Sequence, residues 1–215
     1  MKKSTIILSV LFALTISATN IKAQDAEMDT REKVQFGLKL GLNYSNVYDE
    51  QGDDFQADPK LGLAGGAFLS LPMGKYIGIQ PELLVSQKGF KATGRVLGGT
   101  YDFTRTTTYL DVPLQFALKP SEFFTIVAGP QYSYLLNQRD VFANATTSIA
   151  QEQEFVNDNV RKNMFGVVGG IDINIKHVVV SARTGWDLTQ NNGDGTSQTP
   201  RYKNVWFQGT VGFKF

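Results

Sequence analysis

Three charged residues lie on segments that otherwise alternate between apolar and polar side chains: Glu82, Asp111 and Arg183. Two carboxylates beside a guanidinium could act as acid and base on a bound substrate. The only histidine, His177, stands in a two-residue turn beside no predicted acid or nucleophile, so a Ser-His-Asp site is not supported. Charges that pair with one another inside a folded domain are the commoner arrangement. We therefore predict that the protein is not an enzyme and has no catalytic, cofactor-binding or metal site.

Composition excludes several other kinds of chemistry. The chain has no cysteine, which excludes a disulfide framework, a thiolate metal site and a cysteine nucleophile. Its 21 basic and 20 acidic residues leave a net charge of +1, so there is no polybasic field to bind nucleic acid. The acidic stretch 49–54 and the Asn-Asn-Gly-Asp-Gly run 191–195 could bind Ca²⁺ through oxygen ligands, but neither has the EF-hand spacing. We expect solvated loops there, and no cofactor.

The first 23 residues have the pattern of a secretory signal peptide. Lys2 and Lys3 form a basic start, and residues 6–16 form an apolar stretch that is too short to cross a membrane as a helix. Cleavage is expected after Ala23, with Ala18 as the alternative position, and a retained N-terminal anchor is the other interpretation. The protein is therefore predicted to be exported, with residues 24–33 forming a short N-terminal segment.

The rest of the chain shows a period of two. Residues 34–45 place apolar or aromatic side chains at every even position and polar residues or glycine at nearly every odd one, which is typical of a strand with one apolar face. Segments with this pattern recur along the chain. They cover residues 34–45, 61–71, 77–85, 110–118, 124–134, 165–175, 178–186 and 205–215. The sequence thus predicts eight strands.

Short and long connections alternate between these segments. The short ones are 72–75, 120–122 and 176–177, and the long polar ones are 46–59, 90–104, 138–163 and 189–200. This is the layout of an outer-membrane barrel, with short periplasmic turns and long extracellular loops. We predict an all-β fold over residues 34–215, an eight-stranded antiparallel up-and-down transmembrane β-barrel. It would lie in the outer-membrane lipid of a Gram-negative envelope.

A soluble ligand-binding barrel, with its apolar faces turned inward, is the alternative. Ten strand glycines share the polar face and three the apolar face, which fits a narrow interior with little room along its wall. Aromatic residues also gather near strand ends, as in the interfacial girdles of membrane barrels. They are Tyr44, Tyr76, Tyr101, Phe103, Tyr109, Phe123, Phe124 and Trp186.

The polar face predicts an interior polar network of Lys39, Glu82, Asp111, Gln131 and Arg183. Arg183 is expected to pair with Glu82, Asp111 or both, because an unpaired buried charge is costly.

Three prolines lie inside predicted strands, where each removes a ladder hydrogen-bond donor. They stand in the phrases Gln80-Pro81-Glu82-Leu83-Leu84-Val85, Tyr109-Leu110-Asp111-Val112-Pro113-Leu114 and Ala128-Gly129-Pro130-Gln131-Tyr132. In these phrases, and in residues 165–170 and the final Phe215, the chain resembles the PorT-type family of small outer-membrane β-barrel proteins over about residues 33–215. The resemblance implies an eight-stranded barrel with the prolines at bulges, and a role in a protein secretion machine. Thr184 departs from the family, which usually has a tyrosine there.

The last predicted strand ends in alternating aromatics. Phe213 and Phe215 make the C-terminus similar to the signal that the barrel-insertion machinery reads, and we expect contact with that machinery during biogenesis. The alternative is that a lipid-facing strand is simply apolar.

The predicted function is a structural or protein-interaction role through the extracellular loops, chiefly 138–163, with a secretion component or a pore as alternatives. An eight-stranded barrel is filled by side chains, which argues against a pore.

Overall fold

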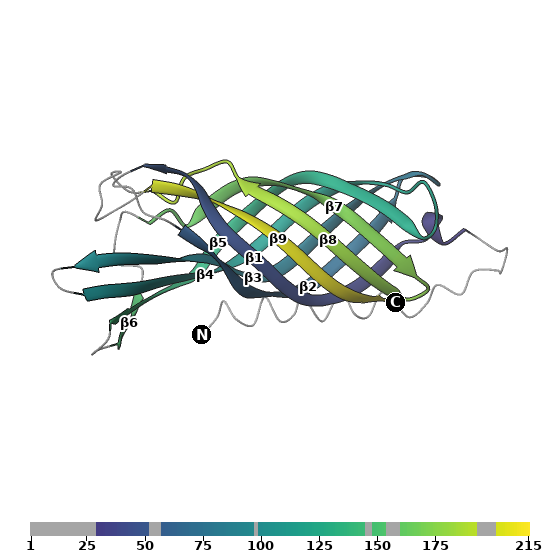
Figure 1. The fold of residues 1–215 in the computed structure, drawn as a ribbon. Coiled ribbons are helices and arrows are strands. Elements are labelled where there is room, and N and C mark those ends of the chain that lie inside the picture. The colour runs from purple at the N-terminus through teal and green to yellow at the C-terminus, as the bar shows by residue number, and fades with distance from the viewer. Residues whose placement is uncertain (1–28, 52–56, 97–98, 145–147, 154–159, 193–200) are drawn as a thin grey trace, which may run out of the picture.

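The computed structural model describes residues 29–51, 57–96, 99–144, 148–153, 160–192 and 201–215. The predicted signal peptide, residues 1–23, lies outside the described residues. In the described part of the chain, a short 3-10 helix, η1 (Thr30–Glu32), precedes the strands (Figure 1). The strands are β1 (Gln35–Gln51), β2 (Ala57–Pro72), β3 (Ile77–Val96), β4 (Gly99–Leu118), β5 (Phe124–Asn144), β6 (Ser148–Gln153), β7 (Asn163–Ile175), β8 (Val178–Asp187) and β9 (Arg201–Lys214). Among these residues, no helix is long and apolar enough to cross a membrane.

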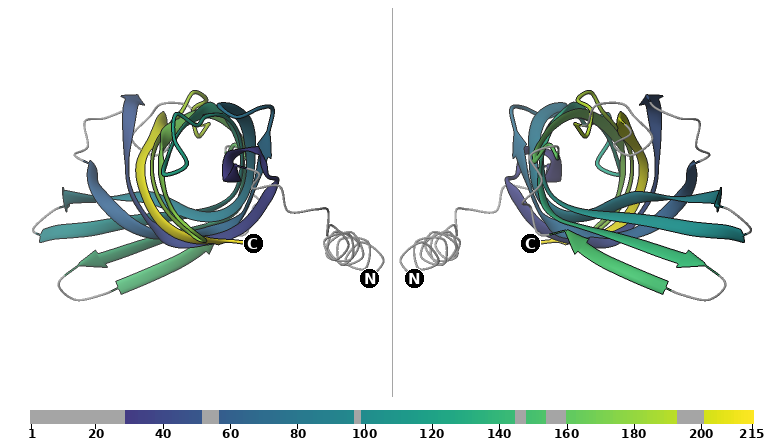
Figure 2. Two further views of the ribbon diagram at one scale, coloured as in Figure 1. Left: turned by 90° about the vertical axis from the view of Figure 1, so that its right-hand side faces the viewer. Right: turned by 90° about the vertical axis from the view of Figure 1, so that its left-hand side faces the viewer.

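Eight of these strands close into a barrel. Neighbours pair antiparallel in the order β1-β2-β3-β4-β5-β7-β8-β9, and β9 pairs back onto β1. Figure 2 shows the closed ring in two end-on views. The eight-stranded antiparallel up-and-down fold predicted from the sequence is therefore confirmed. The connections β2–β3, β4–β5 and β7–β8 are short and lie at the same end as η1 and the C-terminus, which we call the short-turn end.

One face of each barrel strand points outward and carries large apolar side chains, which together form the apolar band. Its most exposed members include Leu40, Phe116 and Phe207, each exposed by more than 60%. The band comprises Leu38, Leu40, Leu42, Leu61, Leu63, Leu83, Val85, Val112, Leu114, Phe116, Ile126, Val167, Ile171, Ile173, Val180, Phe207, Val211 and Phe213. Alternate positions point inward and are mostly polar. A barrel that is apolar around its outside suits lipid, so the soluble barrel with inward apolar faces is wrong.

Three of the strands, β3, β4 and β5, continue past the apolar band at the other end. Beyond Val85 the outward positions of β3 become polar, as at Lys91 and Thr93. The extensions, residues 87–96, 99–108 and 137–144, pair with one another and with β6 to form a sheet that stands out from the barrel (Figure 1). We call it the projecting sheet.

The projecting sheet corrects two sequence-based expectations. The long loops predicted at 90–104 and 138–163 are wrong over much of their length, because most of those residues pair as strands. Threonine-rich stretches such as 104–108 favour extended backbone. Polar side chains on both faces left no alternation of hydropathy by which to recognise these strands.

The three strand prolines do not sit at bulges, contrary to what the family resemblance implied. Register shifts in the described ladders fall elsewhere, at Tyr48/Gln51, Pro59/Ala64 and Thr108/Tyr109. Pro81 pairs with Leu114, Pro113 with Gln131 and Pro130 with Val167, all in unshifted register. Each proline lacks a ladder partner on its other side. The missing N–H thus removes one local pairing without inserting a residue.

Inward-facing glycines let neighbouring strands approach closely. At Gly170 a Cβ atom would lie 2.0 Å from the carbonyl oxygen of Ala182 on the paired strand β8. At Gly209, on the outer face, a Cβ atom would meet no atom within 4 Å. The wall therefore has no room for a methyl group at Gly170 and open space for one at Gly209.

Gly170→Ala should lower the free energy of unfolding by roughly 1–3 kcal/mol, the usual cost of overpacking. Gly209→Ala should change it by less than about 0.5 kcal/mol, as surface substitutions usually do. Urea unfolding of the refolded protein in lipid vesicles measures both. Equal midpoints for the two variants would contradict the close approach at Gly170.

Candidate functional site

Four charged side chains meet inside the barrel and form the central ion cluster. Arg183 of β8 lies between two carboxylates, with its Nη2 atom 2.7 Å from Asp172 Oδ1 of β7 and 3.6 Å from Glu82 Oε1 of β3. Glu82 also forms an ion pair with Lys39 of β1. All four residues are buried. Two positive and two negative charges thus balance within one cluster.

Two glutamines add hydrogen bonds to this cluster. Gln80 Nε2 donates to Glu82 Oε1 at 3.0 Å and to Asp172 Oδ2 at 3.2 Å. Gln115 Oε1 accepts a hydrogen bond from Arg183 Nε at 3.1 Å. Side chains from β1, β3, β4, β7 and β8 are therefore joined through the middle of the barrel. Such contacts are needed, because a buried ion without a partner costs several kcal/mol.

A second buried ion pair lies further from the short-turn end. Lys88 Nζ is 3.2 Å from Asp111 Oδ2, and the Ser86 hydroxyl donates to the same oxygen at 2.5 Å. The ammonium also lies 3.7 Å from a ring centroid of Trp206 and 4.9 Å from that of Tyr109. An aromatic face attracts a cation through its quadrupole. One carboxylate and two aromatic rings thus hold Lys88.

The residues predicted to form one interior network lie at three separate places inside the barrel. Lys39, Glu82 and Arg183 meet in the central ion cluster. Asp111 pairs with Lys88 rather than with Arg183. Gln131 is buried but donates its hydrogen bond within its own strand, β5.

Lys88 and Trp206 are not among the residues predicted from the sequence for the interior network. Both have inward parity, since Lys88 stands six residues after Glu82 on β3 and Trp206 occupies an inward position of β9. Parity therefore could have found them. Tyr109, expected in an outer aromatic girdle, shares the parity of Asp111 and is only 3% exposed. The Tyr109 ring faces the lumen, where it covers the ammonium of Lys88, and not the lipid.

A bidentate ion pair stands where the projecting sheet leaves the barrel. Arg105 Nε and Nη2 donate to the two carboxylate oxygens of Asp140 at 2.8 and 2.7 Å, and Nη1 donates to the Tyr202 hydroxyl at 3.2 Å. The Tyr202 ring packs edge-on against Phe90, with centroids 5.3 Å apart, beside Val47. This buried cluster fills the lumen at the end opposite the short turns.

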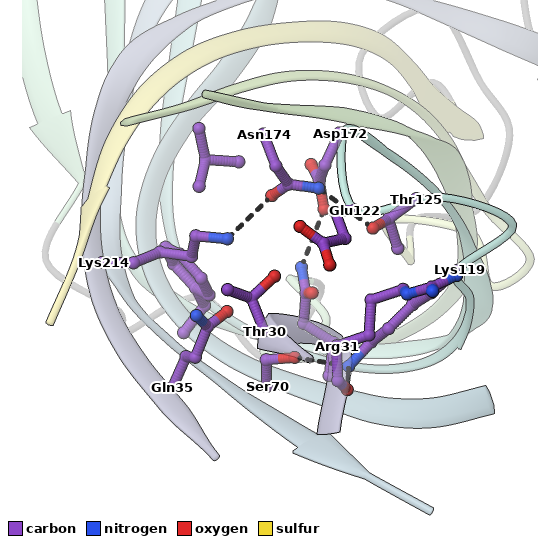
Figure 3. A pocket seen from close by; sticks show the side chains of 13 residues that line it. Thr30, Arg31, Gln35, Ser70, Lys119, Glu122, Thr125, Asp172, Asn174 and Lys214 are labelled. Atoms are coloured by element: carbon purple, nitrogen blue, oxygen red, sulfur yellow. Dashed lines mark hydrogen bonds between the residues drawn. The ribbon is translucent and has the colours of Figure 1, made fainter. Parts of the chain in front are cut away.

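The short-turn end holds a polar cavity of about 30 Å³ (Figure 3). Lys119 Nζ donates to Ser70 Oγ and to the carbonyl oxygen of Arg31, each at 3.2 Å. Burial lowers the pKa of the Lys119 ammonium. Lys214 Nζ donates to Asn174 Oδ1 at 3.0 Å. Lysine side chains from two strand ends therefore face one small space.

Arg31 ties the N-terminal segment across two short turns. Its Nη2 atom is 2.6 Å from Asp29 Oδ2, its Nη1 donates to the Pro120 carbonyl oxygen at 3.4 Å, and its guanidinium lies 5.2 Å from the Tyr76 ring centroid. Lys75 Nζ adds a contact to Asp29 at 3.2 Å. Hydrogen bonds from Arg31, followed by that from Lys75, hold the pKa of the Asp29 carboxyl below its usual value.

These arrangements join side chains of different strands across the barrel. The carboxylates of the central ion cluster and of the Lys88–Asp111 pair face cations at contact distance. Among the described residues, no group of three or more His, Cys, Asp or Glu is placed to hold a metal ion.

Comparison with known proteins gives one family match. The sequence model of a family described as "Outer membrane protein beta-barrel domain" matches residues 22–192. No curated protein sequence matches the chain.

Several solved structures are similar in fold. The attachment invasion locus protein Ail of Yersinia pestis, solved with the heparin analogue sucrose octasulfate, is 11% identical, with 85% of this chain and 99% of that chain covered and a TM-score of 0.46. Neisserial surface protein A is 9% identical, with coverage of 84% and 97% and a TM-score of 0.44. OprG from Pseudomonas aeruginosa is 13% identical, with coverage of 86% and 97% and a TM-score of 0.42.

Arg183→Ala should destabilise the barrel by roughly 3–5 kcal/mol, the range for breaking a buried ion pair, because Asp172 would lose its cation and Glu82 would keep only Lys39. The lipid-facing control Val180→Ala should cost less than about 1 kcal/mol, since lipid fills the space that it leaves. Urea unfolding in lipid vesicles measures the difference. An unchanged midpoint for Arg183→Ala would show that the guanidinium is solvated.

Proposed function

Because this chain belongs to the outer membrane protein beta-barrel domain family, we propose that it is a non-catalytic outer-membrane barrel that binds a protein partner through its projecting sheet. In this proposal the short-turn end faces the periplasm and the projecting sheet stands outside the cell, as in barrels with short periplasmic turns. The observation that carries the proposal is the continuation of β3, β4 and β5 beyond the apolar band.

The filled interior supports a role outside the lumen. The central ion cluster, the Lys88–Asp111 pair and the Phe90–Tyr202 packing occupy successive levels of the barrel. Eight strands enclose little more than their own side chains. A substrate or a water-filled channel therefore has little room inside the barrel, which favours an outer surface as the site of partner binding.

An open strand edge gives that surface a means of recognition. β6 pairs with β5 from Gln138↔Gln153 to Ala143↔Ser148, and with no other strand in the described part of the chain. An edge strand presents backbone N–H and C=O groups that can accept an added strand. We infer that the partner supplies an extended segment to this edge.

We also propose that residues 1–23 are a cleaved signal peptide and that Phe213 and Phe215 form the signal for barrel insertion. In the folded barrel, Phe215 N donates to the carbonyl oxygen of Phe36 at 2.8 Å, so the C-terminus lies at the β1–β9 seam. The Phe213 and Phe215 rings contact each other with centroids 5.2 Å apart and face outward. An outward aromatic pair is accessible to the insertion machinery before β9 pairs with β1.

A second candidate function is membership of a protein secretion machine. The PorT-type phrases around Pro81, Pro113 and Pro130 favour it. In this version the partner at the projecting sheet or at the periplasmic end would be another subunit of the machine.

A photo-crosslinking residue in place of Arg139, which is exposed on the projecting sheet, should capture a discrete protein adduct on intact cells. The same residue in place of the lipid-facing Phe116 is the matched control and should capture no protein. Gel mobility of the boiled and unboiled protein verifies that both variants fold.

Lipid adducts alone at both positions would contradict the interaction role. Identification of the adduct separates the two candidate functions. A secretion subunit crosslinked at position 139, together with loss of secreted proteins when the gene is deleted, supports membership of a secretion machine. An envelope or extracellular protein crosslinked at this position, with secretion intact, supports the barrel that binds a partner through its projecting sheet.

A further inference from the structure

Two buried ammonium groups share the cavity at the short-turn end. Lys119 follows β4 and is 5% exposed, and Lys214 ends β9 and is 8% exposed. Figure 3 shows the two side chains entering the cavity from different sides. An ammonium has three N–H donors. Lys119 uses two of them and Lys214 one, all on uncharged oxygens of described residues.

The nearby carboxylates do not neutralise these lysines. Neither ammonium forms an ion pair with a described carboxylate, although Asp172 and Glu122 line the same cavity. Asp172 is paired with Arg183 at 2.7 Å, and Glu122 is an exposed residue. Among the described residues these two buried ammonium groups therefore have no ion-pair partner, and a bound anion would offset the cost of burying them.

The cavity wall also offers hydroxyl groups. Ser70 and Thr125 are both buried there, and each accepts a hydrogen bond through its oxygen, Ser70 from Lys119 and Thr125 from Asn174. A hydroxyl that accepts in this way still has its own hydrogen to donate. The site thus combines unused N–H donors with two free O–H donors.

We propose that this cavity binds a small inorganic oxyanion of the phosphate class, with Lys119 and Lys214 supplying the charge and Ser70 and Thr125 supplying hydrogen bonds. About 30 Å³ is room for roughly two or three water molecules by the same measure, which one such anion would displace. Organic substrates are too large. In the orientation proposed above, the anion enters from the periplasm, but its binding does not depend on the protein partner.

Inorganic phosphate should bind the refolded mature protein saturably and with one site, as measured by isothermal titration calorimetry at pH 7 and low ionic strength. A sugar-based detergent keeps lipid phosphate out of the sample. Lys119→Gln and Lys214→Gln should each weaken binding about tenfold or more. Lys75→Gln is the matched control, because this lysine lies at the same end but pairs with Asp29, and it should leave the affinity unchanged. Glu122→Gln should strengthen binding by removing a like charge.

Absence of saturable phosphate binding to the parent would overturn the proposal. Equal weakening by Lys75→Gln would also overturn it, because it would show that diffuse positive charge, rather than the cavity, attracts the anion. Gel mobility before and after boiling checks that each variant has folded. If Lys214→Gln fails to fold, Lys119→Gln and Glu122→Gln carry the test.

Discussion

A charge in the middle of a narrow barrel needs an opposite charge across the lumen, and the arrangement of this molecule depends on that constraint. Eight strands leave space for side chains rather than for bulk water. Arg183 therefore lies against Asp172 and Glu82, and Glu82 against Lys39. These residues come from β1, β3, β7 and β8, which face one another only because β9 pairs with β1 and closes the sheet. Closure and charge pairing thus support each other.

The outer and inner faces follow from the same alternation. A side chain that faces lipid must be apolar, and its neighbour along the strand then points into the lumen. At the short-turn end, Arg31 and Lys119 join η1 to the turns. At the opposite end, aromatic packing around Phe90 fills the lumen below the projecting sheet. Between the cavity at the short-turn end and the projecting sheet, side chains therefore occupy the barrel, and the parts free to meet other molecules are its ends.

The barrel itself could be predicted from sequence because alternation in residues such as 34–45 separates a lipid-facing side from a polar side. Inward parity likewise identified Glu82 and Arg183, although it could not tell that Asp111 pairs with Lys88, since the choice between cations depends on height along the barrel. The projecting sheet escaped prediction because residues 104–108 are polar on both faces. The signal peptide and the C-terminal insertion signal at Phe213 and Phe215 stay predictions.

Paired side chains, not water, occupy the lumen between the cavity at the short-turn end and the projecting sheet. Conductance across a planar lipid bilayer tests it most directly, with insertion of the refolded mature protein verified by its gel mobility before boiling. We predict no discrete current steps above those of the protein-free bilayer at ordinary voltages, because the central ion cluster and the Phe90–Tyr202 packing lie inside a barrel that has little room beyond its own side chains. Steady, reproducible current steps from correctly folded barrels would contradict the account.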